Sequence, residues 1–301
     1  SEWYQITVAG SDGSTLSGEA APGKVIGPSF AAEEVPDVIE AVIDTYRRDG
    51  VLVVRDLLSP EEVEVARAGI AAVLEAPSML AQIASGVDDP GRFVEDFRRW
   101  QDIPEIASLA LSSRAAEVAA QLLDTPQVRF YHDHVLVKEG GTKQRTPWHQ
   151  DQPYYNVDGH GTSAWIPVDP VPLAGCLELV AGSHEGPWKM PRTFLDGKAK
   201  WFPEGTLDEL PDIEADRDAF DIRAAEMQPG DAIFFDFLTV HGAPGFPFQG
   251  RRRVLSLRYL ADDARHAPRE WVTSPPFEEL IGVLPEGAPM DHPLFPVVWP
   301  R

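Results

Sequence analysis

Residues 128–137 read VRFYHDHVLV and mark the point at which the hydrophobic pattern of the chain changes. β-Branched and aromatic side chains dominate this stretch, which is typical of a buried strand. Before it, apolar residues recur at helical spacing over 33–48, 59–74 and 103–123. After it, turn residues separate short apolar runs that we expect to be strands, at 163–168, 176–180, 220–224, 232–237 and 254–260.

Helices followed by many short strands predict one mainly β domain, a sandwich or barrel with helices packed outside it. The 28 Pro and 24 Gly suit a loop-rich architecture of this kind. Two further strands are expected earlier in the chain, at 3–8 and 51–54. A polar insertion at 186–219 has the length typical of a lid or binding loop. The Pro-rich tail, 263–301, is expected to wrap the surface.

The composition excludes several classes of partner. The 301 residues include 26 Lys and Arg against 48 Asp and Glu, which gives a net charge of −22. This balance argues against a nucleic-acid partner and against an anionic membrane surface. Cys176 is the only cysteine, so the chain has neither an internal disulfide nor a Cys-based zinc site. No apolar run reaches the roughly 18 residues that span a bilayer, and we expect a cytoplasmic location.

Residues 146–152, TPWHQDQ, place a histidine and an aspartate two positions apart. On an extended segment the side chains of His149 and Asp151 share one face, where an imidazole and a carboxylate would bind the same metal. A pair of this kind also arises by chance in a chain with eight His.

Residues 230–242, GDAIFFDFLTVHG, contain a tight turn, a buried strand and a histidine at the end of the strand. His241 is followed by small residues and is expected to face a cavity, although a hydrogen-bonded rim histidine would have the same pattern. Together with His149 and Asp151 it would supply two imidazoles and one carboxylate. This set leaves three octahedral positions open, as in non-haem Fe(II) oxygenases.

Residues 251–259, RRRVLSLRY, begin with basic residues and continue as a strand. Alternation along a strand puts Arg252, Ser256 and Arg258 on one face. An arginine that points into a barrel is costly unless it binds an anion, and a carboxylate is its natural partner. The alternative is a solvent-facing strand with exposed arginines.

These windows resemble the phytanoyl-CoA dioxygenase family of Fe(II)- and 2-oxoglutarate-dependent oxygenases. The likeness extends from about residue 128 to 260 and rests on order and spacing together. The segments that carry it are TPWHQD at 146–151, AWIP at 164–167, GCLELVAGSH at 175–184, PGD at 229–231, His241-Gly242, and an arginine eleven residues after that histidine.

The resemblance implies a double-stranded β-helix, or jelly roll, of the cupin-like class. It implies one oxygenase domain over 1–301, with a mostly helical part at 1–125, the jelly roll at 126–262 and the tail at 263–301. The implied cofactors are Fe(II), 2-oxoglutarate and O₂. The implied iron ligands are His149, Asp151 and His241, and the implied 2-oxoglutarate residues are Arg252, Trp165 and His134.

The expected reaction is hydroxylation of an unactivated C–H bond in a small molecule, with release of succinate and CO₂. Candidate substrate contacts are Arg258, Arg98 and Trp100, although a structural ion pair for Arg258 and a solvated helix for residues 93–100 are alternatives. Asp151 fills a position that is Ala or Gly in related halogenases, so halogenation is not expected. Desaturation, epimerisation and cyclisation use the same cofactors. A cupin-like isomerase or hydrolase without 2-oxoglutarate and a non-catalytic binding protein are further alternatives. No sequence feature specifies an oligomeric state.

Overall fold

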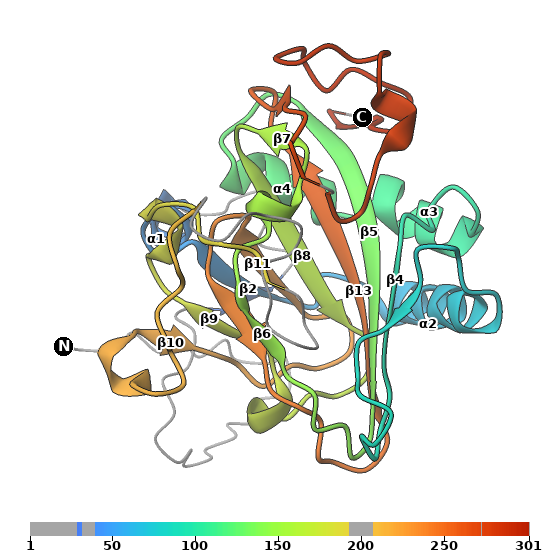
Figure 1. The fold of residues 1–301 in the computed structure, drawn as a ribbon. Helices are drawn as coiled ribbons and strands as arrows, with labels where there is room; N and C mark the ends of the chain where they lie inside the picture. The colour runs from blue at the N-terminus through green and yellow to red at the C-terminus, as the bar shows by residue number, and fades with distance from the viewer. Residues whose placement is uncertain (1–28, 32–39, 193–206, 272, 301) are drawn as a thin grey trace, which may run out of the picture.

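The structure, a computed structural model, describes residues 29–31, 40–192, 207–271 and 273–300. Two mainly antiparallel sheets face each other, and helices lie outside the larger sheet (Figure 1). This arrangement confirms the expected mainly β, jelly-roll fold with flanking helices.

The strands of the two sheets come from both halves of the chain. Within the described residues, the larger sheet has nine strands. Its order is β1 (Ser29–Ala31), β2 (Val51–Arg55), β11 (Ala232–Asp236), β8 (Gly161–Pro167), β13 (Arg251–Leu260), β5 (Val128–Glu139), β4 (Phe93–Phe97) and β3 (Gln82–Ile83), with β15 (Val297–Trp299) also on β5. The smaller sheet has the order β10 (Ile222–Arg223), β9 (Glu178–Val180), β12 (His241–Ala243) and β6 (Thr146–His149), and β14 (Arg265–His266) pairs with β7 (Val157–Asp158).

The two faces of the larger sheet have different surroundings, as the side chains of β13 show. Leu255, Leu257 and Tyr259 point outward into a core shared with the helices. Arg252 and Ser256 point inward, toward the smaller sheet. The period-2 alternation expected for this strand is therefore present, and it directs polar side chains into the space between the sheets.

The helices that pack on the outer face are α1 (Glu40–Asp49), α2 (Pro60–Glu75), α3 (Pro104–Ser112) and α4 (Ala115–Leu122). The expected helical stretch 103–123 is divided in two. At Ser113 the backbone is extended, with φ −73° and ψ 169°, so the i to i−4 hydrogen bonds stop and a second helix begins two residues later.

Helix α2 begins at the cap that its sequence predicts. The side chain of Ser59 accepts a hydrogen bond from the backbone N–H of Glu62, and the Glu62 carboxylate accepts one from the backbone N–H of Ser59. We expect Ser59→Ala to lower the free energy of unfolding by about 1 kcal/mol. Ser112→Ala, at an exposed helix end, is the control and should change it by less than about 0.5 kcal/mol in urea unfolding. Equal effects of the two variants would contradict this capping role.

The N-terminal part contributes more than helices. Strands β2 and β4 belong to the larger sheet, so residue 125 does not separate a helical part from the sheet. The alternative of a helix at 93–100 is wrong, because Phe93, Glu95 and Phe97 alternate as inward-facing, buried residues of β4.

The C-terminal tail also differs from a simple surface wrap. It adds β15 to the larger sheet and β14 to β7. Its Phe277, Leu280 and Phe295 form a core with Tyr131 of β5, so the tail closes one end of the fold.

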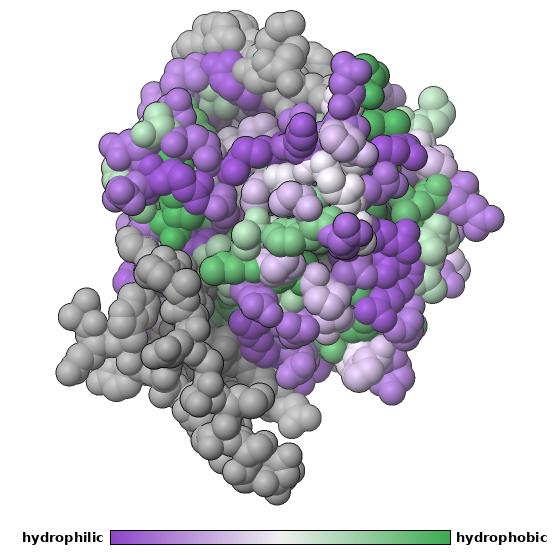
Figure 2. All heavy atoms as spheres, turned by 90° about the horizontal axis from the view of Figure 1, so that it is seen from below, coloured by the Kyte–Doolittle hydropathy of each residue, from purple (hydrophilic) through white to green (hydrophobic). Residues whose placement is uncertain are grey.

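The expected strand at 3–8 and the insertion residues 193–206 lie outside the described residues. No helix in the described part of the chain is both long and apolar enough to cross a membrane. On the face seen in Figure 2, hydrophilic residues predominate and hydrophobic residues gather near the centre.

Candidate metal centre

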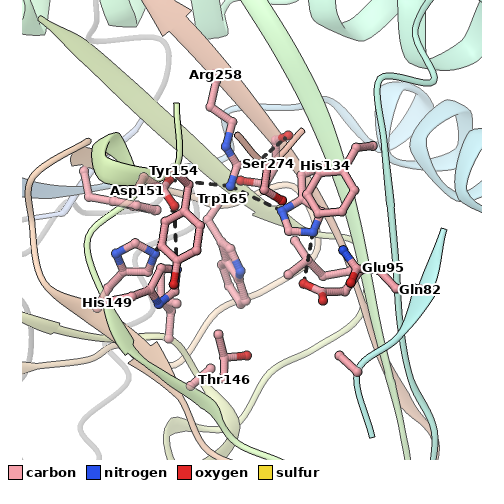
Figure 3. Close-up of a pocket in the computed structure, with 18 of the residues that line it drawn as sticks. Gln82, Glu95, His134, Thr146, His149, Asp151, Tyr154, Trp165, Arg258 and Ser274 are labelled. Carbon is pink, nitrogen blue, oxygen red and sulfur yellow. Dashed lines mark hydrogen bonds and ion pairs between the residues drawn. The ribbon is translucent and has the colours of Figure 1, made fainter. Parts of the chain in front are cut away.

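A cavity of about 260 Å³ lies between the two sheets (Figure 3). Strands β3, β4, β5, β8, β11 and β13 line one side of it, and β6 and β12 line the other. Strand pairing places His241 on β12 directly opposite His149 on β6. Asp151 follows β6 in a turn, where its backbone N–H donates a hydrogen bond of 2.8 Å to the carbonyl of Phe237. The three predicted ligands therefore meet at one wall.

The three side chains present one donor atom each to a common point. These donor atoms all lie within 4.8 Å of one another. Nε2 of His149 is 3.6 Å and Nε2 of His241 is 3.7 Å from Oδ1 of Asp151. Such spacing suits three ligands on one face of a metal ion.

Hydrogen bonds fix the tautomer of both histidines. Nδ1 of His149 lies 2.8 Å from the carbonyl oxygen of Pro147, and Nδ1 of His241 lies 2.9 Å from that of Thr239. A carbonyl oxygen only accepts, so each Nδ1 carries a proton and each Nε2 lone pair faces the shared point. Burial, and then the nearby His149, lowers the pKa of His241 to about 3, which keeps this imidazole neutral.

The second oxygen of Asp151 is held by protein donors. Oδ2 accepts a hydrogen bond of 2.9 Å from the Ser163 hydroxyl, and Nη2 of Arg258 lies 3.5 Å away. Burial alone would raise the pKa of Asp151, but the Arg258 guanidinium holds it well below its usual value. The aspartate is thus a carboxylate with Oδ1 directed at the histidines. Two imidazoles and a carboxylate are the donor set of a facial-triad iron site, and these residues fit it.

A second polar group in the cavity is a guanidinium that has no acidic partner in the described part of the chain. Arg252 is 1% exposed, and its Nη1 donates a 2.5 Å hydrogen bond to the carbonyl of Gly175. Its Nε and the hydroxyl of Ser256 have no hydrogen-bond partner among the described residues. Burial lowers the pKa of Arg252 to about 10, so it is still a cation at neutral pH. A buried cation of this kind needs an anion, and the cavity beside it has room for one.

The structure brings the other expected 2-oxoglutarate residues to the same cavity. The Trp165 ring lies 5.6 Å from Cζ of Arg252. His134 lines the wall beyond it, stacked on Phe97 at a centroid distance of 4.0 Å. Their roles toward the cosubstrate stay predictions.

Arg258 also lines the cavity, but its donors point at protein atoms. Nε donates to the Tyr155 hydroxyl at 3.0 Å, and Nη1 donates to the Ser256 carbonyl at 3.2 Å. Nη2 lies 3.5 Å from Oδ2 of Asp151, so Arg258 forms the structural ion pair that is the alternative to a substrate contact.

Arg98 and Trp100 do not line the cavity, which corrects the expectation that they contact substrate. Arg98 has a positive φ of 59°, and this turns the chain out of β4. Its guanidinium pairs with Glu279 at 2.6 Å. Trp100 packs edge-on against Phe130 in the helix-facing core.

Sequence reasoning missed three contributors to the site, namely Glu95, Ser163 and the Phe237 carbonyl. One sequence pattern could have identified Glu95, because it is a charged residue between Phe93 and Phe97, at an inward position of an alternating strand. Ser163 and a backbone carbonyl have no sequence signature of this kind.

We expect Arg258→Met to weaken metal binding about 10- to 100-fold, because Asp151 loses the cation that orients its outer oxygen. Ser163→Ala should act in the same direction but less, since it removes one neutral hydrogen bond. Calorimetric titration of Mn(II) into the apoprotein measures both. Arg253→Met is the control, because Arg253 lies on the same strand and pairs with Asp169 outside the cavity. Unchanged Mn(II) affinity in Arg258→Met would refute this positioning role.

Comparisons with known proteins agree with this geometry. A family model described as phytanoyl-CoA dioxygenase matches residues 46–254. The peroxisomal phytanoyl-CoA dioxygenase of Rattus norvegicus is 24% identical over 268 residues, which cover 80% of this chain and 77% of that protein. The ectoine dioxygenase of Stutzerimonas stutzeri is 26% identical, covering 78% and 81%.

Solved structures show the same similarity. A non-haem, α-ketoglutarate-dependent carbocyclase from nogalamycin biosynthesis is 25% identical with a TM-score of 0.68, and the match covers 87% of this chain and 97% of that one. An epimerase in complex with Fe³⁺ and α-ketoglutarate is 22% identical with a TM-score of 0.70, covering 87% and 99%, and supports the fold.

Proposed function

The chain belongs to the phytanoyl-CoA dioxygenase family of Fe(II)- and 2-oxoglutarate-dependent oxygenases, and we propose that it hydroxylates an unactivated C–H bond of a small metabolite or natural-product intermediate. One observation carries the proposal. A three-ligand metal site shares a single cavity with a buried arginine that has no acidic partner among the residues that the structure describes.

In this proposal His149, Asp151 and His241 hold the iron. The Pro147 and Thr239 carbonyls fix the two imidazoles, and Arg258 and Ser163 fix the carboxylate. Bound Fe(II) supplies O₂ activation, in which 2-oxoglutarate is oxidised to succinate and CO₂ and the substrate C–H becomes an alcohol. Because Asp151 occupies one position on the metal, no room is left there for a halide, and halogenation is not proposed.

Arg252 and Ser256 bind the far carboxylate of 2-oxoglutarate. Nε of Arg252 and the Ser256 hydroxyl, both on β13, are buried polar atoms that have no hydrogen-bond partner among the described residues. A carboxylate would satisfy both. Trp165 and Leu136 line the cavity around this position and exclude water from it.

Epimerisation or ring formation by the same cofactors is the second candidate. The favouring observation is the likeness to the carbocyclase, with a TM-score of 0.68 over 87% of this chain. Product analysis distinguishes these outcomes, because hydroxylation adds one oxygen atom and ring formation removes two hydrogen atoms.

Calorimetric titration of 2-oxoglutarate into the Mn(II)-loaded protein tests the proposal. We expect saturable heat from one site, and Fe(II)-dependent succinate release from the iron-loaded protein. Absence of both would favour a cupin-like isomerase or hydrolase, which would not need Arg252.

A further inference from the structure

Glu95 is a buried carboxylate that the proposed reaction does not use. It is 3% exposed and lines the cavity from β4, across from the metal ligands (Figure 3). Its Oε1 has no hydrogen bond from any described residue, and Nε2 of His134 lies 3.1 Å from it. A carboxylate this deeply buried is costly without a donor.

His134 does not neutralise Glu95. Nη2 of Arg258 lies 3.4 Å from Nδ1 of His134. A guanidinium only donates, so Nδ1 must be an acceptor and the ring proton lies on Nε2, directed at Glu95. Burial lowers the pKa of His134 below its usual value, and the ring is therefore neutral. The Nε2–H group lies 3.1 Å from Oε1 without the alignment of a hydrogen bond, so this contact brings no positive charge to Glu95.

Lys138 on β5 and the two arginines of the cavity wall are engaged elsewhere. Nζ of Lys138 donates to the carbonyls of Gln144 at 3.0 Å and Pro244 at 2.9 Å. Arg252 bonds to Gly175, and Arg258 bonds to Tyr155. Among the described residues, none of these three cations forms an ion pair with Glu95.

The surroundings of Glu95 combine one polar end with apolar walls. Gln82 on the adjacent edge strand β3 is in register with Glu95 and lines the exposed side of the cavity. Phe97, Leu136 and Ala84 line the cavity nearby. A molecule with an apolar body and one hydrogen-bond donor fits such a wall, whereas an anionic group would be repelled.

We propose that Glu95 determines substrate specificity by accepting a hydrogen bond from a hydroxyl or ammonium group on an otherwise apolar substrate. This inference rests on the proposed function, because it places the substrate between Glu95 and the metal. An anionic group on the substrate would not be accepted at this position.

Three probes with the same six-carbon ring test the inference: cyclohexylammonium, cyclohexanol and cyclohexanecarboxylate. Each is added to the protein loaded with Mn(II) and 2-oxoglutarate, and Mn(II)-induced relaxation of the probe protons is measured by NMR. The Zn(II)-loaded protein is the diamagnetic reference, and His241→Ala is the blank for surface-bound Mn(II). We expect enhanced relaxation for the ammonium probe, the alcohol probe or both, and none for the carboxylate. The ammonium and alcohol arms identify which donor is preferred.

Two variants tie the result to this side chain. Glu95→Gln keeps the shape but loses the charge, and Glu95→Leu also loses the acceptor. We expect Glu95→Gln to weaken any ammonium binding about tenfold or more, and Glu95→Leu to weaken any alcohol binding about tenfold or more. Glu75→Gln, at an exposed helix end, is the matched control. Thermal melting and Mn(II) binding verify that each variant is folded.

The inference is overturned if the carboxylate probe relaxes as strongly as the others, if no probe relaxes, or if the Glu95 variants bind as the unaltered protein does. If 2-oxoglutarate binding is normal, any of these results refutes the role of Glu95 and leaves the proposed function unaffected. Failure of the unaltered protein to bind 2-oxoglutarate refutes the proposed function instead.

Discussion

Replacing His241 by alanine is expected to abolish Fe(II)-dependent succinate release and to weaken metal binding by more than about 100-fold. Loss of an outer-shell contact already costs 10- to 100-fold in metal affinity, and loss of a ligand costs more. The pairing of the smaller sheet also places His241 directly opposite His149. A residue next to His241 on the strand therefore cannot replace it as a ligand. His149→Ala should have the same effect. Metal content after dialysis and succinate release measure the two losses.

A metal-dependent shift in stability provides an independent readout. A ligand that binds only the folded state raises its stability by an amount that grows with the ratio of free ligand to Kd. A chelator should therefore lower the melting temperature of the loaded protein and leave that of His241→Ala unchanged. His160→Ala is the control, since His160 is exposed and pairs with Asp263 outside the cavity. Retained iron and activity in His241→Ala would show that the metal is held elsewhere.

The metal pair in TPWHQDQ shows which part of the site can be predicted from the sequence. The two-residue spacing predicts that His149 and Asp151 share a face of an extended segment. In the structure β6 ends at His149, and Asp151 has helical dihedrals, φ −74° and ψ −45°. Its side chain reaches the common point because its backbone N–H is bonded to the Phe237 carbonyl. The spacing identified the residues, and a long-range contact set their geometry.

Strand alternation was more reliable than the helix-or-strand assignment of short apolar runs. Alternation alone put Arg252 and Ser256 on one face of β13, and both do point inward. The run around Glu95 has five residues in β4, which is too short for periodicity to separate a strand from a helix. Its inward direction depends on pairing with β5, some forty positions later. Such pairing is a tertiary property, and the sequence alone therefore misses Glu95 and places Arg98 at the substrate.

Replacing Arg252 by methionine is expected to weaken 2-oxoglutarate binding by about 30- to 3,000-fold. Truncating one partner of a buried, hydrogen-bonded charge pair costs about 2–5 kcal/mol, and each 1.4 kcal/mol is a factor of ten in Kd. The same change should raise the melting temperature of the protein without 2-oxoglutarate, because it removes a buried guanidinium whose Nε has no hydrogen-bond partner among the described residues. Calorimetry on the Mn(II)-loaded protein and thermal melting measure the two opposite effects.

Arg251→Met is the matched control, because Arg251 is the preceding residue on β13 and is exposed. It should change neither 2-oxoglutarate binding nor the melting temperature beyond the small effects of a surface substitution. A buried arginine whose only function is to stabilise the fold would give the opposite pattern, with a lower melting temperature and little change in 2-oxoglutarate affinity. The sign of the change in melting temperature thus separates a binding arginine from a structural one, because the cost of burying the guanidinium is recovered only when the carboxylate is bound.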